Sequence, residues 1–141
     1  MSKIIKKLLL IIILIQFIHS YAYRPRIEFT HLRVQDGLSQ SWVKSIYQDK
    51  YGFMWFGTNE GLNKYDGYNF TVYRNNPEDQ NTISNNGISS IYEDKKGDLW
   101  IGTENGVNLY DRNKDRFVYI YSLSHKVIVD FLELENGEIF M

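Results

Sequence analysis

Hydrophobic residues in the central part of the chain come in short runs, each ended by small or polar residues. Phe53-Met54-Trp55-Phe56 is followed by glycine and threonine, and so is Leu99-Trp100-Ile101. An amphipathic helix would need apolar residues at i, i+3 and i+4 over about ten positions, which these runs are too short to provide. Short runs rich in aromatic and β-branched residues are typical of strands, and unbroken apolar runs indicate strands that are covered on both faces.

The turn residues between these runs divide the chain into hairpins. Asp49-Lys50-Tyr51-Gly52 has aspartate first and glycine fourth, and Asp94-Lys95-Lys96-Gly97 has the same order. This is the preferred composition of a type I turn, in which the aspartate side chain caps nearby backbone N–H groups. The pattern predicts strands at Ser45–Gln48, Phe53–Gly57, Leu62–Tyr65, Phe70–Tyr73, Ser90–Glu93, Leu99–Gly102, Val107–Tyr110 and Phe117–Tyr121.

The second set of four predicted strands repeats the first at a spacing of 45 positions. Asp94 aligns with Asp49, and Trp100 aligns with Trp55, without any gap. Self-similarity at such a period is the signature of repeat architectures, and four antiparallel strands in about 45 residues form one blade of a β-propeller. Because blades stack face to face, we expect both tryptophans to pack between blades.

A third copy begins near the end of the sequence. Residues 131–133 and 136–140 match 91–93 and 96–100 at a spacing of 40, with Phe140 in the tryptophan position. The expected fold is therefore all-β: two complete four-stranded propeller blades plus the start of a third. Since a propeller closes with about four to eight blades, the sequence predicts an incomplete fragment of a larger propeller. Ring closure by association of several copies is the alternative.

The N-terminal segment has the features of a secretory signal. Lys3, Lys6 and Lys7 precede an apolar run from Leu8 to Ile18, and residues 20–22 form a small-x-small cleavage site. An uncleaved anchor helix is the alternative, although the run of eleven residues is shorter than the ~20 that span a bilayer.

The repeat pattern sets the remaining boundaries. Residues 23–36 form a lead-in, in which Ile27–Leu32 is a candidate closing strand for the propeller or else a plain edge strand. The predicted segments are 1–22 signal peptide, 23–36 lead-in, 37–73 blade one, 74–87 asparagine-rich loop, 88–121 blade two and 122–141 start of blade three.

Composition narrows the possible partners and chemistry. The chain has no cysteine, which excludes disulfides and a lipid-modified cysteine anchor. Its formal net charge is −1 and becomes more negative when the three lysines of the signal segment are removed. A mildly acidic chain without a basic cluster argues against binding to nucleic acid or to an anionic membrane surface through this segment.

No catalytic, cofactor or metal site is predicted. Asp111, Asn113 and Asp115 match the first three ligands of a calcium loop, but Arg116 stands where such a loop needs glycine. We therefore interpret this segment as a solvated hairpin turn. The histidines His31 and His125 are single and far apart in the sequence, without the spacing of metal ligands.

The repeated motif resembles a known family. Gly37-Leu38-Ser39 precedes Asp49-x-x-Gly52-Phe53-x-Trp55-Phe56-Gly57-Thr58-x-x-Gly61-Leu62-x-x-Tyr65-Asp66-Gly67, and a copy follows at 94–111. The motif resembles the two-component regulator propeller repeat, found in the N-terminal periplasmic sensor region of hybrid two-component histidine kinases of Bacteroidetes. The resemblance extends over residues 27–141.

The resemblance implies a function. It implies the N-terminal fragment of an exported, ligand-sensing propeller at the periplasmic face of the inner membrane. Its partners would be a small glycan and the remaining blades of the parent protein. The membrane span and the kinase would lie downstream, so this chain itself would have no enzymatic activity. The alternative is a fragment of a secreted propeller enzyme or binding module that acts on polysaccharide.

The candidate ligand-binding residues are one tryptophan and several asparagines. Tryptophan and tyrosine rings stack on sugars, and Trp42 is not required by the repeat because Gly87 takes its place in the second copy. Amide side chains are concentrated in the loop that joins the two blades. The candidate ligand-binding residues are Trp42, Asn75, Asn76, Asn85 and Asn86.

Overall fold

The computed structural model describes residues 3–8 and 28–141. These residues belong to two units, Met1–His31 and Leu32–Met141. In the first unit residues 3–8 are helical, whereas the rest of the predicted signal segment, including its cleavage site, lies outside the described residues. Within the described part of the chain, no helix combines the length and the apolar character needed to cross a membrane.

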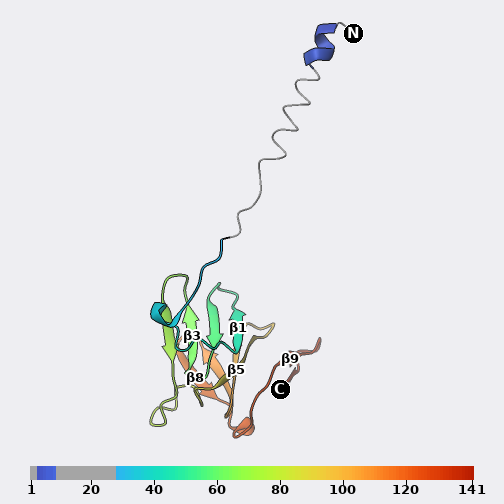
Figure 1. Ribbon diagram of the computed structural model, residues 1–141. Helices are drawn as coiled ribbons and strands as arrows, with labels where there is room; N and C mark the ends of the chain where they lie inside the picture. Colours follow the sequence, from blue (N-terminus) through green and yellow to red (C-terminus); the bar gives the residue numbers. More distant parts are fainter. Residues whose placement is uncertain (1–2, 9–27) are drawn as a thin grey trace. The chain divides into compact units, whose positions relative to one another are not determined.

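The second unit contains two antiparallel sheets of four strands each (Figure 1). The first sheet consists of β1 (Ser45–Gln48), β2 (Met54–Gly57), β3 (Leu62–Tyr65) and β4 (Phe70–Tyr73). The second consists of β5 (Ile88–Glu93), β6 (Leu99–Thr103), β7 (Gly106–Asp111) and β8 (Arg116–Tyr119). Each sheet follows sequence order, as expected for a propeller blade, and the predicted strand ends are within two residues of those observed.

A third hairpin follows the second sheet. Strand β9 (Leu132–Glu133) pairs with β10 (Ile139–Phe140) around a turn closed by Leu134 and Glu138. The connection to this hairpin repeats the connection between the first two sheets. The backbone N–H of Ile88 donates to the carbonyl oxygen of Thr58 at 2.8 Å, and that of Ile128 donates to Thr103 at 3.1 Å. The third copy of the repeat therefore starts with the same contacts as the second.

Two predicted strand assignments differ from the strands observed among the described residues. The candidate closing strand Ile27–Leu32 is absent over its described part, since residues 28–33 form no strand. A strand obtains its backbone hydrogen bonds from a neighbour, and neither four-stranded sheet pairs with this segment. The last strand of the second blade ends at Tyr119, because residues Tyr121–Leu123 turn into the short 3-10 helix η2.

The core between the sheets is built around Trp55, which is fully buried. Its ring lies edge-on to the ring of Tyr110 from the second sheet, with 5.0 Å between the centroids. The apolar residues of this core are Trp55, Leu62, Ile83, Ile88, Ile91, Leu99, Ile101, Tyr110 and Phe117. Trp100, in contrast, is only partly buried and packs beside Phe131 in a second, smaller cluster. The predicted packing of tryptophans between successive repeats is therefore observed.

Each blade also contains a buried polar network that the sequence analysis missed. Asn63 is fully buried; its Oδ1 accepts a hydrogen bond from the backbone N–H of Ser39, and its Nδ2 donates to the Ser39 hydroxyl, both at 2.8 Å. The hydroxyl groups of Ser39 and Thr58 lie 2.8 Å apart. The second blade repeats this network with Asn108, Ser84 and Thr103. The network fixes the chain segment before each blade to the middle strands of that blade.

The repeated aspartate joins its turn to the tryptophan. Oδ1 of Asp49 accepts backbone N–H groups of Tyr51 and Phe53, and Oδ2 accepts Nε1 of Trp55 at 2.9 Å. Burial raises the pKa of Asp49, but the hydrogen bonds from Trp55 and Arg112 and the charge of Arg112 outweigh this effect and lower the pKa below its ordinary value. The predicted turn-capping role of Asp49 is confirmed. Its hydrogen bond to Trp55 is a further contact that the sequence analysis did not predict.

Candidate functional site

The asparagine-rich loop between the two sheets is folded by its own side chains. Oδ1 of Asn86 accepts the backbone N–H of Asn75 at 2.7 Å, and Nδ2 of Asn75 donates to the carbonyl oxygen of Ile83 at 2.7 Å. Oδ1 of Asn85 accepts the backbone N–H of Gly87 at 2.7 Å. Amide side chains favour such local bonds to the backbone, which stabilise turns. Three of the predicted ligand-binding asparagines therefore hold the loop in its shape.

Asn76 has a freer position in the same loop. Its backbone N–H donates to the Thr82 hydroxyl at 2.9 Å, and its Oδ1 accepts the backbone N–H of Glu78 at 3.1 Å. Its Nδ2 group has no hydrogen-bond partner among the described residues, so it remains able to donate to a ligand.

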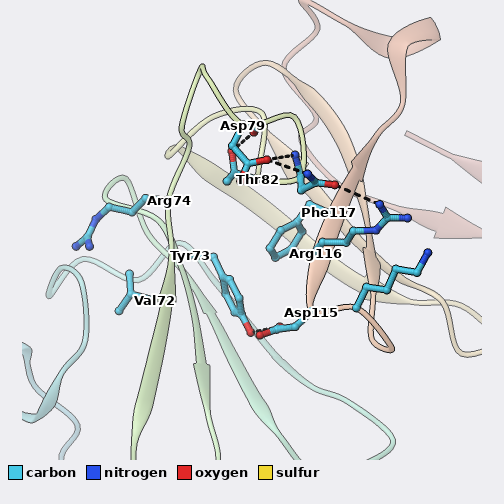
Figure 2. Close-up of a pocket in the computed structure, with 10 residues that line it drawn as sticks. Val72, Tyr73, Arg74, Asp79, Thr82, Asp115, Arg116 and Phe117 are labelled. Carbon is cyan, nitrogen blue, oxygen red and sulfur yellow. Dashed lines mark hydrogen bonds between the residues drawn. The ribbon is translucent and has the colours of Figure 1, made fainter.

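The loop borders two adjacent hollows, which Asp79 and Thr82 line in common. The larger one, here called the charged hollow, has a volume of about 550 Å³ and is shown in Figure 2. It is lined by Val72, Tyr73, Arg74, Asp79, Asn81, Thr82, Lys114, Asp115, Arg116 and Phe117. The smaller one, here called the tyrosine hollow, has a volume of about 230 Å³. It is lined by Asn75, Asn76, Pro77, Asp79, Gln80, Thr82, Ile83, Ser84, Asn105, Tyr119 and Tyr121.

The charged hollow lies where the two blades meet, because β4 supplies Tyr73 and the second blade supplies Asp115 and Phe117. The Tyr73 hydroxyl donates to Oδ1 of Asp115 at 2.6 Å, and the Tyr110 hydroxyl donates to the same oxygen at 2.5 Å. Figure 2 shows the Tyr73 side chain pointing toward Asp115. The rings of Tyr73 and Phe117 are 5.1 Å apart in an edge-on arrangement. Because Phe117 is only 2% exposed, the aromatic surface that faces the hollow comes from the half-buried ring of Tyr73.

The hydroxyl cluster perturbs the acid–base properties of its members. Burial and the hydrogen bond to Asp115 raise the pKa of Tyr110 to about 12 and shift the pKa of Tyr73 in the same direction. Burial raises the pKa of Asp115, but the hydrogen bonds from Tyr110 and Tyr73 outweigh it and lower the pKa. Near neutral pH, Asp115 is therefore a carboxylate held by two neutral phenols.

Positive side chains stand around the same hollow. Nε of Arg116 donates to Oδ2 of Asp111, and its NH1 group donates to Oδ1 of Asn81, both at 3.2 Å. Figure 2 shows Arg74 extending to the side away from Arg116. Lys114 lies in the turn between β7 and β8 and also lines the hollow. The cations that face the hollow, Lys114 and Arg116, therefore both come from the second blade, and Arg116 is paired with Asp111.

The tyrosine hollow combines exposed aromatic surface with amide groups. The rings of Tyr119 and Tyr121 meet edge-on, with 4.9 Å between their centroids, and Tyr121 is 68% exposed. The Tyr119 hydroxyl donates to the carbonyl oxygen of Asn105 at 3.1 Å, which fixes that ring. Asn76 and Asn105 carry amides at the edge of the same hollow. Aromatic faces next to such donors and acceptors suit a polar, ring-shaped ligand.

Trp42 does not join this group. Its side chain is 73% exposed, in the segment before β1, and it lines neither hollow. Trp42 was selected because the aligned position of the other repeat holds a different kind of residue, and the same criterion selects Tyr121. The strand pairings align Phe117 with Phe70, so Tyr121 takes the place of Arg74 and is not required by the repeat. The comparison of the two repeats could therefore have identified Tyr121 as a candidate, which the sequence analysis missed.

The calcium-like segment has other partners in the structure. Asp111 pairs with Arg116, and Asp115 binds the two tyrosine hydroxyls, so the two carboxylates serve different contacts. Across residues 3–8 and 28–141, no group of three or more His, Cys, Asp or Glu side chains is placed to hold a metal ion. His31 and His125 are both exposed.

Comparison with known proteins identifies the repeats. The family model "Two component regulator propeller" matches residues 37–60 and 82–105. The curated protein "Histidine kinase P4" of Formosa agariphila is 62% identical over 48 residues, which are 34% of this chain and 4% of that protein. This chain therefore matches only a small part of the length of its curated relative.

Two solved structures are similar to part of this chain. The extracellular domain of a protein described as a one component system from B. thetaiotaomicron has a TM-score of 0.59 and 28% identity, and the match covers 69% of this chain and 14% of that one. A second structure of the same extracellular domain, there described as part of a hybrid two component system, is also 28% identical, with a TM-score of 0.49, over 68% of this chain and 12% of that one.

Proposed function

The chain carries two two-component regulator propeller repeats, and we propose on this basis that it is part of the ligand-sensing region of a histidine kinase-like sensor. The observation that carries the proposal is the stretch of 48 residues that is 62% identical to a histidine kinase. The solved neighbour is an extracellular domain, which supports a position outside the inner membrane. In such a sensor the propeller is a non-catalytic region, and its role is to bind a ligand.

The ligand would act through the contact between successive blades. A ligand changes a conformational equilibrium only if it binds one arrangement better than another. The asparagine-rich loop starts at the end of β4 and finishes before β5, so a molecule bound in the tyrosine hollow contacts the second blade and the segment that connects it to the first. Binding there would favour one relative arrangement of the blades and transmit it along the stack of repeats.

We propose a saccharide as the ligand of the tyrosine hollow. The exposed ring of Tyr121 offers a face for stacking on a pyranose ring, while Nδ2 of Asn76 offers a hydrogen-bond donor for its hydroxyl groups. If a sugar covers about 50 Å² of the tyrosine ring, ~25 cal/mol per Å² gives about 1.3 kcal/mol, or roughly tenfold in Kd. Trp42 remains a second candidate contact, separate from this hollow.

The test is calorimetric titration of the full chain with a panel of oligosaccharides. We expect Tyr121→Ala to weaken the binding of the active oligosaccharide roughly tenfold. Tyr68→Ala is the matched control, because Tyr68 is 88% exposed and lines neither hollow. Equal affinities for the parent chain and Tyr121→Ala would contradict the proposed site, and a folded chain that binds no saccharide would contradict the proposed ligand.

A further inference from the structure

We propose that the chain associates head to tail with a second copy of itself, through the outer face of the first sheet in one copy and the third hairpin of the other. This contact repeats one that the structure already contains twice, between the first and second repeats and between the second and third. The partner is therefore identified by the chemistry of contacts that exist within a single chain.

Each repeat packs on the repeat before it through one face, here called the leading face, and receives the next repeat on the other, here called the trailing face. The leading-face residues are Ile88, Ile91 and Leu99 in the second repeat and Ile128, Phe131 and Ile139 in the third. The trailing-face residues that they meet are Tyr47 and Trp55 in the first repeat and Tyr92 and Trp100 in the second. Both contacts use aligned positions of the repeat, so a single pattern describes them.

The leading face of the first repeat is exposed. Its positions are held by Val43, Ile46 and Met54. Ile46 is 61% exposed, whereas its counterparts Ile91 and Phe131 are 6% and 7% exposed because a preceding repeat covers them. Apolar surface that the other two repeats bury is therefore available on the first sheet for a partner.

The trailing face of the third hairpin is exposed in the same way. Leu132 aligns with Tyr92, and Phe140 aligns with Trp100. The side chains of Leu132 and Phe140 are 62% and 56% exposed, whereas Trp55, at the same position of the first repeat, is fully buried under the second sheet. One chain therefore presents both halves of the contact, an exposed leading face and an exposed trailing face.

A polar contact accompanies the apolar one at each junction between repeats. The backbone N–H of Lys50 donates to Oε2 of Glu93 at 2.8 Å. The backbone N–H of Lys95 donates to Oε2 of Glu133 at 3.1 Å. In both pairs the lysine ammonium group lies 4.0 Å from Oε1 of the glutamate, so a cation on the trailing side faces an anion on the leading side.

The two exposed faces differ from this pair in a matching way. Glu135 stands where the first two repeats have lysine, and Gln48 stands where the other two have glutamate. A glutamate opposite Glu135 would bring two like charges together, which disfavours a contact. Gln48 avoids this repulsion: its Nε2 donates to the carbonyl oxygen of Gly52 at 3.4 Å, and its Oε1 can accept the backbone N–H of Glu135 from a second copy. The leading face of one copy therefore suits the trailing face of another.

The deciding experiment is sedimentation equilibrium of the full chain over roughly 10 µM to 1 mM, the range that reveals a small and weak contact. The average mass of the parent chain should rise with concentration. Ile46→Asp places a charge on the leading face and Phe140→Asp places one on the trailing face, so each variant alone should remain a monomer. A mixture of the two variants should form heterodimers, because a head-to-tail contact is heterologous and each variant keeps the face that the other has lost.

The polar position gives a second, milder test with substitutions at exposed residues. Gln48→Glu should weaken the association roughly 2- to 5-fold, because the new carboxylate faces Glu135. Adding Glu135→Lys to Gln48→Glu should restore the parent affinity, since it recreates the lysine–glutamate pair of the other junctions. Failure of the double variant to recover affinity would overturn the proposed pairing of these faces.

The control is Tyr68→Asp, in the turn between β3 and β4. Tyr68 is 88% exposed and belongs to neither face, so this variant should associate like the parent chain. Circular dichroism establishes that each variant is folded. A parent chain that stays monomeric over the whole range would overturn the proposal. Association that persists in Ile46→Asp or in Phe140→Asp would overturn it as well, because another surface would then carry the contact.

Discussion

Replacing Arg112 with methionine should destabilise the contact between the two blades more than any comparable surface change. NH1 of Arg112 lies 2.6 Å from Oδ2 of Asp49 in the first blade, and NH2 lies 2.9 Å from Oε1 of Glu93 in the second. The arginine side chain is 20% exposed, and those of its partners are 0% and 6% exposed. The substitution therefore leaves two buried carboxylates without their shared cation.

The size of the effect follows from this burial. Removing one partner of a buried ion pair costs about 3–5 kcal/mol, since the remaining charge stays desolvated. Here other donors remain, because Trp55 still donates to Asp49, and the backbone N–H of Lys50 still donates to Glu93 at 2.8 Å. We therefore expect the low end of that range, about 3 kcal/mol. With a urea m-value of about 2 kcal/mol per M, the unfolding midpoint falls by roughly 1.5 M.

The loss should also depend on pH in a defined direction. The folded-state pKa of Asp49 lies below its ordinary value of 3.8, although burial alone would raise it. The stabilisation that goes with this lowered pKa is fully present above the unfolded-state pKa of 3.8. It is lost as the pH falls through the folded-state pKa. The difference between the parent chain and Arg112→Met should therefore be largest near neutral pH and shrink as the pH approaches 3.8 and below.

The assay is urea unfolding of the full chain, followed by far-ultraviolet circular dichroism at several pH values. Arg33→Met is the control, because Arg33 is exposed and only its backbone makes hydrogen bonds. The reasoning is refuted if Arg112→Met unfolds within about 0.5 kcal/mol of the parent chain at neutral pH. It is refuted as well if the loss grows toward acidic pH.

Two further predictions concern aromatic residues. Trp55→Phe should lower the free energy of unfolding by about 2–3 kcal/mol, because a fully buried ring leaves a cavity and Asp49 loses a donor. Trp100→Phe should cost at least about 1 kcal/mol less, since that ring is only partly buried; equal losses in urea unfolding would count against stacked blades. Tyr110 should ionise near pH 12 in a tyrosine-resolved NMR titration, and Asp115→Asn should move this value toward 10. A parent-chain Tyr110 that titrates near 10 would refute the buried hydroxyl cluster.

The strands and turns were predictable because they depend on local composition and on the repeat. The turn at Asp49–Gly52 needs aspartate at its start and a left-handed glycine at its end, and Gly52 has a φ of 88°. The buried position of Trp55 followed from its place in an unbroken apolar run. Such features need no knowledge of residues far away in the sequence.

The polar interior of the blades was not predictable in the same way. Asn63 is as buried as the apolar core, but its partner Ser39 lies 24 positions earlier in the sequence. Composition alone assigns asparagine to turns and surfaces, so only the recurrence at Asn108 could have drawn attention to it. The role of Arg112 was missed because this residue does not recur: the first repeat has Gly67 at the aligned position.

The candidate site was predicted in part. Asn75 and Asn76, which the sequence placed in an asparagine-rich loop between the blades, line the tyrosine hollow, and their role in ligand binding stays a prediction. The hollows themselves depend on how the second blade packs against that loop, and this brings in Tyr121 and Lys114 from more than thirty residues away. The repeat marks Tyr121 as a residue outside its pattern, but nothing in a single sequence shows that Tyr121 and Lys114 face this loop.

The most direct test of the account is hydrogen–deuterium exchange of the full chain with and without a bound oligosaccharide. The account predicts that the ligand slows exchange in the loop 75–86 and in residues 114–121, which border both hollows. Protection confined to the segment around Trp42, or no change in the loop at a saturating concentration of ligand, would contradict the claim that this region senses the ligand.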